Sequence, residues 1–203
     1  MLAGPTSAIG LGVFNPIVKA YVLAGTCILV ACVGRGPKTP EAAFDSLAQG
    51  VANGSAETVF DALDQNTRWS WMTVQRCHRE AFDAVLSNFP EGQDKEQKLR
   101  YLEAAATSET AADIFAAKLG TQAIAELKGR LPSPRPLFTV AADQATAPSV
   151  TGPPLVFARI EGRWGFAGFA AESDEQKRRA VADLEMIKTS ATDYERARTL
   201  GKP

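Results

Sequence analysis

The residues of this chain that could perform acid–base chemistry centre on one histidine. His78 is the only histidine among 203 residues, and it lies in a run of apolar residues at helical spacing, so it is expected to point inward. A buried imidazole can act as a general base when an acid or hydroxyl lies within hydrogen-bond reach. Asp143, Glu161 and Tyr101 are candidate partners, although sequence spacing alone does not place them beside it. The alternative, which we favour, is a histidine that packs in the core.

Other chemistry-bearing residue types give weaker signals. Cys77 adjoins His78, but consecutive side chains on a helix point in different directions, so we expect a buried packing cysteine and not a reactive thiolate. Trp69 and Trp71 could form an aromatic binding surface or could anchor the helix start in the core, and we prefer the second interpretation. A single histidine with a single neighbouring thiol cannot build a zinc site. The sequence therefore predicts no metal and no cofactor, and no nucleophile motif of the Gly-x-Ser-x-Gly kind occurs.

The element that positions His78 is a helix expected over residues 67–89. Its apolar residues recur at the 3.6-residue helical period, and Pro90 ends it. The stripe consists of Trp71, Val74, His78, Ala81, Phe82, Val85 and Phe89.

Further helices are expected on both sides of this one. Thr39-Pro40-Glu41 is typical of a helix start, and Ser55 can cap a second, short helix. Between Asp94 and Leu131 we expect two or three helices, broken near Thr107-Ser108 and Gly120-Thr121.

After Pro132, Pro134 and Pro136 the sequence pattern favours strands and no longer helices. Short strands are expected at 137–142, 146–150, 154–160 and 164–170, with turns at Asp143-Gln144, Gly152-Pro153 and Glu161-Gly162. Strands joined by such short turns form an antiparallel meander. Glycines 162, 165 and 168 are interpreted as strand glycines that allow close backbone approach or bulging.

A last helix is expected after the strands. Ser173-Asp174-Glu175-Gln176 has the pattern of a capping box, and one face of the helix would carry Val181, Leu184, Ile187, Ala191 and Tyr194. Helices first, then an antiparallel sheet, then a C-terminal helix indicate a single α+β domain over residues 40–200.

A charge-free apolar segment lies at residues 20–31, directly after Lys19. This arrangement is typical of a secretory signal peptide, because a membrane-spanning helix needs about 20 apolar residues. The segment ends in Leu29-Val30-Ala31-Cys32, which resembles the lipobox of bacterial lipoproteins. The resemblance implies that a signal peptide of residues 1–31 is removed between Ala31 and Cys32, and that Cys32 carries a diacylglyceryl group and further acyl chains such as palmitate. Residues 32–39 would then form a short tether.

Composition limits the remaining classes of function. Hydrophobic residues make up 45% and charged residues 22% of the chain, which is ordinary for a globular protein and unlike a disordered tail or a multi-span membrane protein. The formal net charge is −1, and such a near-neutral surface argues against nucleic acid as a partner.

Two places in the chain resemble the nuclear-transport-factor-2-like (SnoaL-like) superfamily. The helix start Thr39–Phe44 and the hairpin residues Gly162-Arg163-Trp164 match the beginning and the closing hairpin of related bacterial lipoproteins. The resemblance covers residues 39–170 and implies a cone-like fold, in which the inward face of the long helix borders a pocket. The helical segment at 91–131 and the helix after Ser173 depart from the family pattern.

The sequence thus leads to one favoured function and two alternatives. We expect an envelope lipoprotein, facing the periplasm or the exterior, that binds a small apolar molecule, a peptide or another envelope protein without catalysis. His78, Trp71 and Trp164 would border its pocket. The first alternative is an isomerase-like or hydrolase-like enzyme that pairs His78 with a carboxylate. The second is a structural subunit of an envelope complex that docks through its C-terminal helix.

Overall fold

The computed structural model describes residues 36–201 and confirms the α+β class, with helices first, an antiparallel sheet after them and a C-terminal helix. The described residues all belong to one compact unit. The signal segment, Ala31, Cys32 and the first half of the tether lie outside the described residues. Within residues 36–201, no helix combines the length and the apolar character needed to cross a bilayer.

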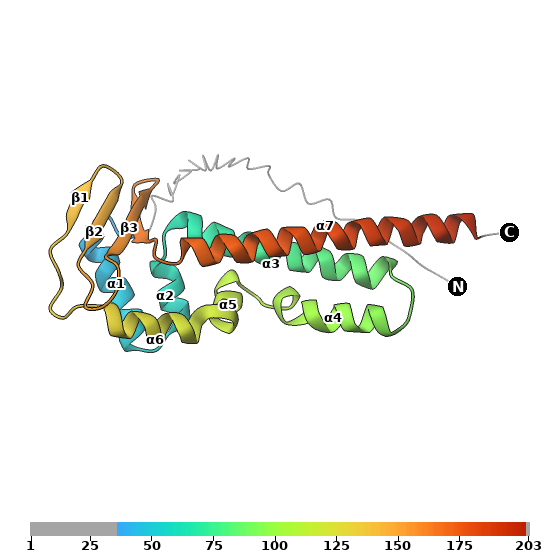
Figure 1. Cartoon of the computed structure of the whole chain (residues 1–203), viewed down its shortest axis with the longest axis horizontal. Coiled ribbons are helices and arrows are strands. Elements are labelled where there is room, and N and C mark those ends of the chain that lie inside the picture. The colour runs from blue at the N-terminus through green and yellow to red at the C-terminus, as the bar shows by residue number, and fades with distance from the viewer. Residues whose placement is uncertain (1–35, 202–203) are drawn as a thin grey trace, which may run out of the picture. The chain divides into compact units, whose positions relative to one another are not determined.

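The elements follow one another as shown in Figure 1. The helical part consists of α1 (Pro40–Ala52), α2 (Ala56–Ala62), α3 (Gln65–Asn88), α4 (Gln93–Ala106), α5 (Ala111–Phe115), the π-helical turn η1 (Ala116–Gly120) and α6 (Thr121–Arg130). The sheet consists of β1 (Thr139–Ala141), β2 (Gln144–Ala147), β3 (Leu155–Ile160) and β4 (Arg163–Phe166), and α7 (Ala170–Leu200) closes the chain.

Side-chain caps begin the first three helices. The Thr39 hydroxyl accepts a hydrogen bond from the Ala42 amide at 3.2 Å, and the Ser55 hydroxyl accepts one from the Thr58 amide at 3.1 Å, as their sequence patterns predicted. Asp64 caps α3 by accepting from the amides of residues 66 and 67. The long helix therefore begins two residues earlier than the apolar stripe indicated.

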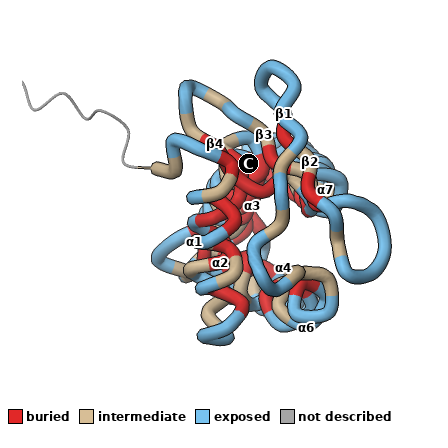
Figure 2. The backbone as a smooth tube through the Cα atoms, turned by 90° about the vertical axis from the view of Figure 1, so that its left-hand side faces the viewer, coloured by how far each residue is buried: buried red, intermediate tan, exposed pale blue. Residues whose placement is uncertain are grey.

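The apolar stripe of α3 is the centre of the helical part. Trp71, Val74, His78, Ala81, Val85 and Phe89 are buried, and Phe82 is partly buried. This face packs chiefly against α4, α5 and α7, and α7 runs along α3 (Figure 1). In Figure 2 the buried residues of α1 and α3 lie in the interior and the connecting loops are exposed.

The sheet is an antiparallel meander in the order β1-β2-β3-β4. The Glu161-Gly162 turn between β3 and β4 is confirmed, with φ of 51° and 73°. The first turn was misplaced by one residue: it is Ala142-Asp143 and not Asp143-Gln144. Its position follows from Asp143, whose carbonyl and carboxylate both accept hydrogen bonds from Arg159 at 2.7 Å.

The sheet packs against α1 through a group of aromatic rings. The ring of Phe44 on α1 lies 6.1 Å from Phe138 and 6.5 Å from Phe157, between ring centroids. The face of α3 that carries His78 packs chiefly on the helices α4, α5 and α7.

Two expectations about helix boundaries were wrong. No break occurs at Gly120-Thr121, because η1 runs directly from α5 into α6. Helix α7 begins at Ala170, so Ser173 lies inside the helix and is not its cap. Leu184, Ile187 and Ala191 are buried on α7 as expected, but Val181 is 41% exposed.

Candidate functional site

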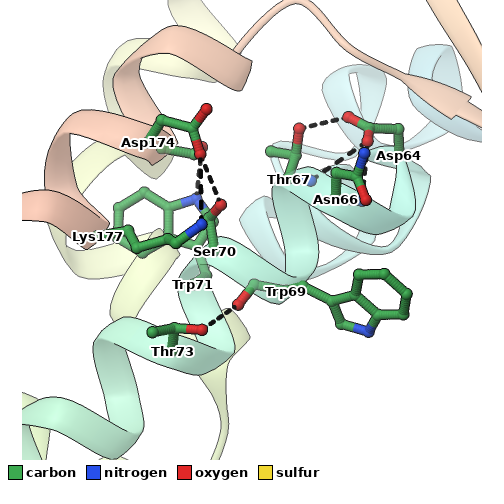
Figure 3. Close-up of polar contacts among 10 residues, drawn as sticks. Asp64, Asn66, Thr67, Trp69, Ser70, Trp71, Thr73, Asp174 and Lys177 are labelled. Atoms are coloured by element: carbon green, nitrogen blue, oxygen red, sulfur yellow. Dashed lines mark hydrogen bonds and ion pairs between the residues drawn. The ribbon is translucent and has the colours of Figure 1, made fainter.

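The three residues expected to border one pocket lie in three different places. Trp71 is completely buried, and its indole Nε1–H donates a hydrogen bond of 2.9 Å to the Ser173 hydroxyl of α7. Next to it, the Ser70 hydroxyl donates to the Asp174 carboxylate at 2.9 Å (Figure 3). Trp71 is therefore a core residue that joins α3 to α7, which agrees with the core interpretation made from the sequence.

Trp164 is buried in the sheet, opposite Arg159 in the β3–β4 register. The guanidinium carbon of Arg159 lies 5.5 Å from the centre of the indole ring. Trp164 borders a cavity near Pro37, which is separate from the surroundings of His78. Trp69, the other tryptophan of α3, is 46% exposed, so the expectation that it anchors the helix start in the core was wrong.

His78 borders a hollow of about 210 Å³ that opens to the surface between α3, α4, α5 and η1. Its walls are mainly the small apolar side chains of Ala104, Ala105, Ile114 and Ala117. The polar residues Tyr101, Ser108 and Lys118 also border it. A mainly apolar hollow with a few convergent polar groups is the usual form of a small-molecule site.

The π-helical turn η1 brings Ala117 and Lys118 to this cavity. A π turn widens a helix by one residue and often lies at a functional site. It is held in place by close packing, since a Cβ atom at Gly120 would lie 2.7 Å from the Cβ atom of Ala56 on α2. Sequence reasoning did not find Lys118, because the extra residue interrupts the 3.6-residue period from which helix faces are inferred.

Burial makes His78 a neutral imidazole at neutral pH. Only 5% of the residue is exposed, and loss of hydration lowers its pKa below 6.5. The positive charge of Lys118 lowers the pKa further, and the carboxylate of Asp183 opposes the shift.

The Nδ1 atom of His78 is completely buried and has no hydrogen-bond partner among the described residues. Nε2 is not among the buried atoms without a partner. The single proton of the neutral ring is therefore better placed on Nε2.

The candidate acid partners of His78 are engaged elsewhere. Asp143 forms an ion pair with Arg159, and Glu161 accepts a hydrogen bond from Gln65 at 2.8 Å. Tyr101 is near, with ring centroids 6.3 Å apart, but its hydroxyl donates to Asp183 at 3.1 Å. Within residues 36–201, no carboxylate is hydrogen-bonded to His78.

Cys77 and the acidic residues offer no second centre in the described part of the chain. Cys77 is buried, and burial raises the pKa of its thiol, which disfavours the reactive thiolate. Residues 36–201 contain no cluster of three or more histidine, cysteine or acidic side chains that could hold a metal ion.

Comparison with known proteins adds no assignment: no protein-family model, no curated protein and no solved structure matches this chain.

Proposed function

We propose that this protein is a lipid-anchored envelope protein whose domain binds a small, mainly apolar molecule in the His78 cavity without transforming it. The observation that carries the binding proposal is a mainly apolar cavity of about 210 Å³ that contains a buried neutral imidazole with no protein partner. The anchor is supported by the lipobox-like sequence that ends at Cys32.

The size of the cavity limits the ligand. Cavities of about 150 Å³ hold benzene, and sites for drug-sized molecules occupy about 300–1,000 Å³. A cavity of about 210 Å³ therefore fits one substituted ring or a short branched chain.

The polar groups of the cavity limit the ligand's chemistry. His78 would offer an Nε2–H donor and Lys118 an ammonium group, while the Tyr101 hydroxyl is engaged with Asp183 and the Ser108 hydroxyl with the Ala104 carbonyl. Both available groups donate, so the ligand should carry a hydrogen-bond acceptor, namely a carbonyl or a carboxylate. Alanine and isoleucine side chains would surround its apolar part.

The experiment compares three probes of similar size: benzene, benzaldehyde and benzoate. Binding to the purified, lipidated protein in detergent is followed by the NMR shifts of the His78 ring. We expect benzaldehyde or benzoate to bind more tightly than benzene. Ala104→Leu, at an exposed position on the cavity wall, should abolish binding because it fills the space.

A matched control separates filling of the cavity from general disturbance. Ala125→Leu makes the same change at an exposed position of α6 that does not border the cavity, and it should leave binding intact. If none of the probes shifts the His78 resonances, or if Ala104→Leu binds as well as the original protein, the cavity is not the ligand site.

A further inference from the structure

A second cavity lies where the described chain begins. It has a volume of about 390 Å³, and Gly36 and Pro37 of the tether form part of its wall. The Trp164 amide donates a hydrogen bond of 2.9 Å to the Pro37 carbonyl, so β4 holds this stretch of the tether. The cavity shares no lining residue with the His78 cavity.

Two arginines from different elements border this second cavity. Arg68 comes from the first turn of α3, and Arg163 is the first residue of β4. The side chain of Arg163 lies against Gly36, where a Cβ atom would be 3.0 Å from its Cδ. The two guanidinium groups are thus brought to one hollow by the tertiary fold, 95 positions apart in the sequence.

Neither arginine has an ion-pair partner among the described residues. Nε of Arg68 is completely buried and makes no hydrogen bond. The nearby cap residue Asp64 already accepts hydrogen bonds from two amides and from the Thr67 hydroxyl. Both arginines are partly buried, and a partly desolvated charge without a counter-ion is costly, so the site favours an added anion.

The remaining charge of the cavity wall is compatible with an anion. Asp61 is the single carboxylate on the wall, against the two arginines. The side chains of Ser46 and Gln49 add neutral hydrogen-bonding groups. The planar fork of an arginine matches the oxygen atoms of a phosphate, to which it can donate two parallel hydrogen bonds.

We propose that the Arg68–Arg163 cavity binds a phosphate group. The group could belong to a phospholipid headgroup or to free phosphate. The lipid source rests on the proposed anchor: Cys32 precedes Gly36 by four residues, which span at most roughly 14 Å of extended chain. An acylated Cys32 would hold the cavity close to the headgroups.

The test uses the purified, lipidated protein in detergent micelles and follows the Arg Nε–H resonances by NMR. Three additions are compared at equal ionic strength: inorganic phosphate, dihexanoyl phosphatidylglycerol and sodium chloride. We expect saturable shifts of the Arg68 and Arg163 resonances with phosphate or with the phospholipid, and none with chloride. Saturation by the phospholipid alone identifies a headgroup, and saturation by inorganic phosphate identifies the free anion as a sufficient ligand.

Variants show whether the arginines are responsible. Arg68→Gln and Arg163→Gln should each weaken phosphate binding about tenfold or more, because each removes a charge-assisted donor. Arg100→Gln makes the same change at an exposed position of α4 and should have no effect. Thermal melting identifies any variant that does not fold. If Arg163→Gln does not fold, Arg163→Lys replaces it. Lysine keeps the positive charge but lacks the planar guanidinium, so this variant should still bind phosphate more weakly than the original protein.

Two results would overturn the proposal: no saturable shift with either phosphate compound, or equal affinity in Arg100→Gln and in both cavity variants. The outcome for phosphate does not depend on the His78 cavity, because binding there is measured separately, with benzaldehyde and benzoate and the His78 resonances.

Discussion

At the scale of single residues, His78 should make the stability of the fold depend on pH. It is the only histidine, and no other side chain has an ordinary pKa between about 5 and 8. Burial and the nearby charge of Lys118 lower its pKa in the folded protein. The unfolded chain therefore takes up a proton at a higher pH than the folded chain does.

This difference predicts how the free energy of unfolding depends on pH. Above about pH 6.5 the imidazole is neutral in both states. As the pH falls below this value, the unfolded state binds the proton first, so the stability falls by at most about 1.4 kcal/mol per pH unit until the folded pKa is reached. Denaturant unfolding between pH 7.5 and 5.5 measures the slope.

His78→Gln is the matched variant for this measurement. It should melt at a lower temperature than the original protein and should lose the histidine-dependent part of the slope. In Lys118→Met the free energy of unfolding should depend less on pH, because the variant lacks the positive charge that helps to lower the pKa of His78. A His78→Gln protein with unchanged melting temperature and unchanged slope would show that His78 has neither effect.

Trp164 provides a second prediction at the residue scale. The hairpin that the Glu161-Gly162 turn predicted pairs β4 with β3, and in it Trp164 is 5% exposed and lies opposite Arg159. Trp164→Ala should lower the free energy of unfolding by about 3–5 kcal/mol, because it leaves a cavity in the sheet. Trp69→Ala, at a half-exposed indole, is the control. A loss below about 1 kcal/mol for Trp164→Ala would contradict the observed packing.

At the scale of elements, the joint between β4 and the start of α3 depends on one glycine. The Asp64 amide donates to the Phe166 carbonyl at 3.0 Å, and a Cβ atom at Gly165 would lie 2.5 Å from the Leu63 carbonyl oxygen and from the Asp64 Cα. Both opposing atoms belong to backbone, so they cannot move aside as a side-chain end could. This is the close approach that the glycine pattern of the strand predicted.

Gly165→Ala should therefore destabilise the fold by roughly 1–3 kcal/mol or more, through overpacking. Gly129→Ala is the control, because no atom lies within 4 Å of its added Cβ and alanine favours a helix by about 0.5–1 kcal/mol. The two substitutions should shift the urea midpoint in opposite directions. Shifts of the same sign and size would argue against the close contact.

The joint between α3 and α7 depends on a buried hydrogen bond. Ser173→Ala leaves the indole N–H of Trp71 without its acceptor, which should cost about 1–3 kcal/mol of unfolding free energy. Ser190→Ala is the control on the same helix, since that hydroxyl donates only to the Met186 carbonyl of α7 itself. Equal melting temperatures for the two variants would show that the Trp71–Ser173 bond contributes little.

At the scale of the whole molecule, the proposed membrane attachment is tested through Cys32, which lies outside the described residues. Cys32→Ser removes the sulfur that would receive the diacylglyceryl group, so cells fed radioactive palmitate should label the original protein and not the variant. The precursor of the variant should also stay uncleaved at this position. Cys77→Ser serves as the control, because that thiol is buried and should not affect labelling. Equal label on all three proteins would refute the lipid anchor.

The sequence by itself determined the elements whose signals are local. Helical periodicity placed the buried face of α3, hydroxyl caps placed the starts of α1 and α2, and turn residues placed the β3–β4 hairpin. Each of these depends on residues within a few positions of one another, so it can be inferred without knowing the rest of the fold. The inward direction and lowered pKa of His78 follow from the same periodicity.

Only the tertiary structure decided which residues meet. It placed Tyr101 and Lys118 beside His78, and it engaged the expected acid partners Asp143 and Glu161 elsewhere. It also brought Arg68 and Arg163 to one hollow beside the tether. These encounters depend on how helices and strands far apart in the chain pack together, and local periodicity does not contain that information.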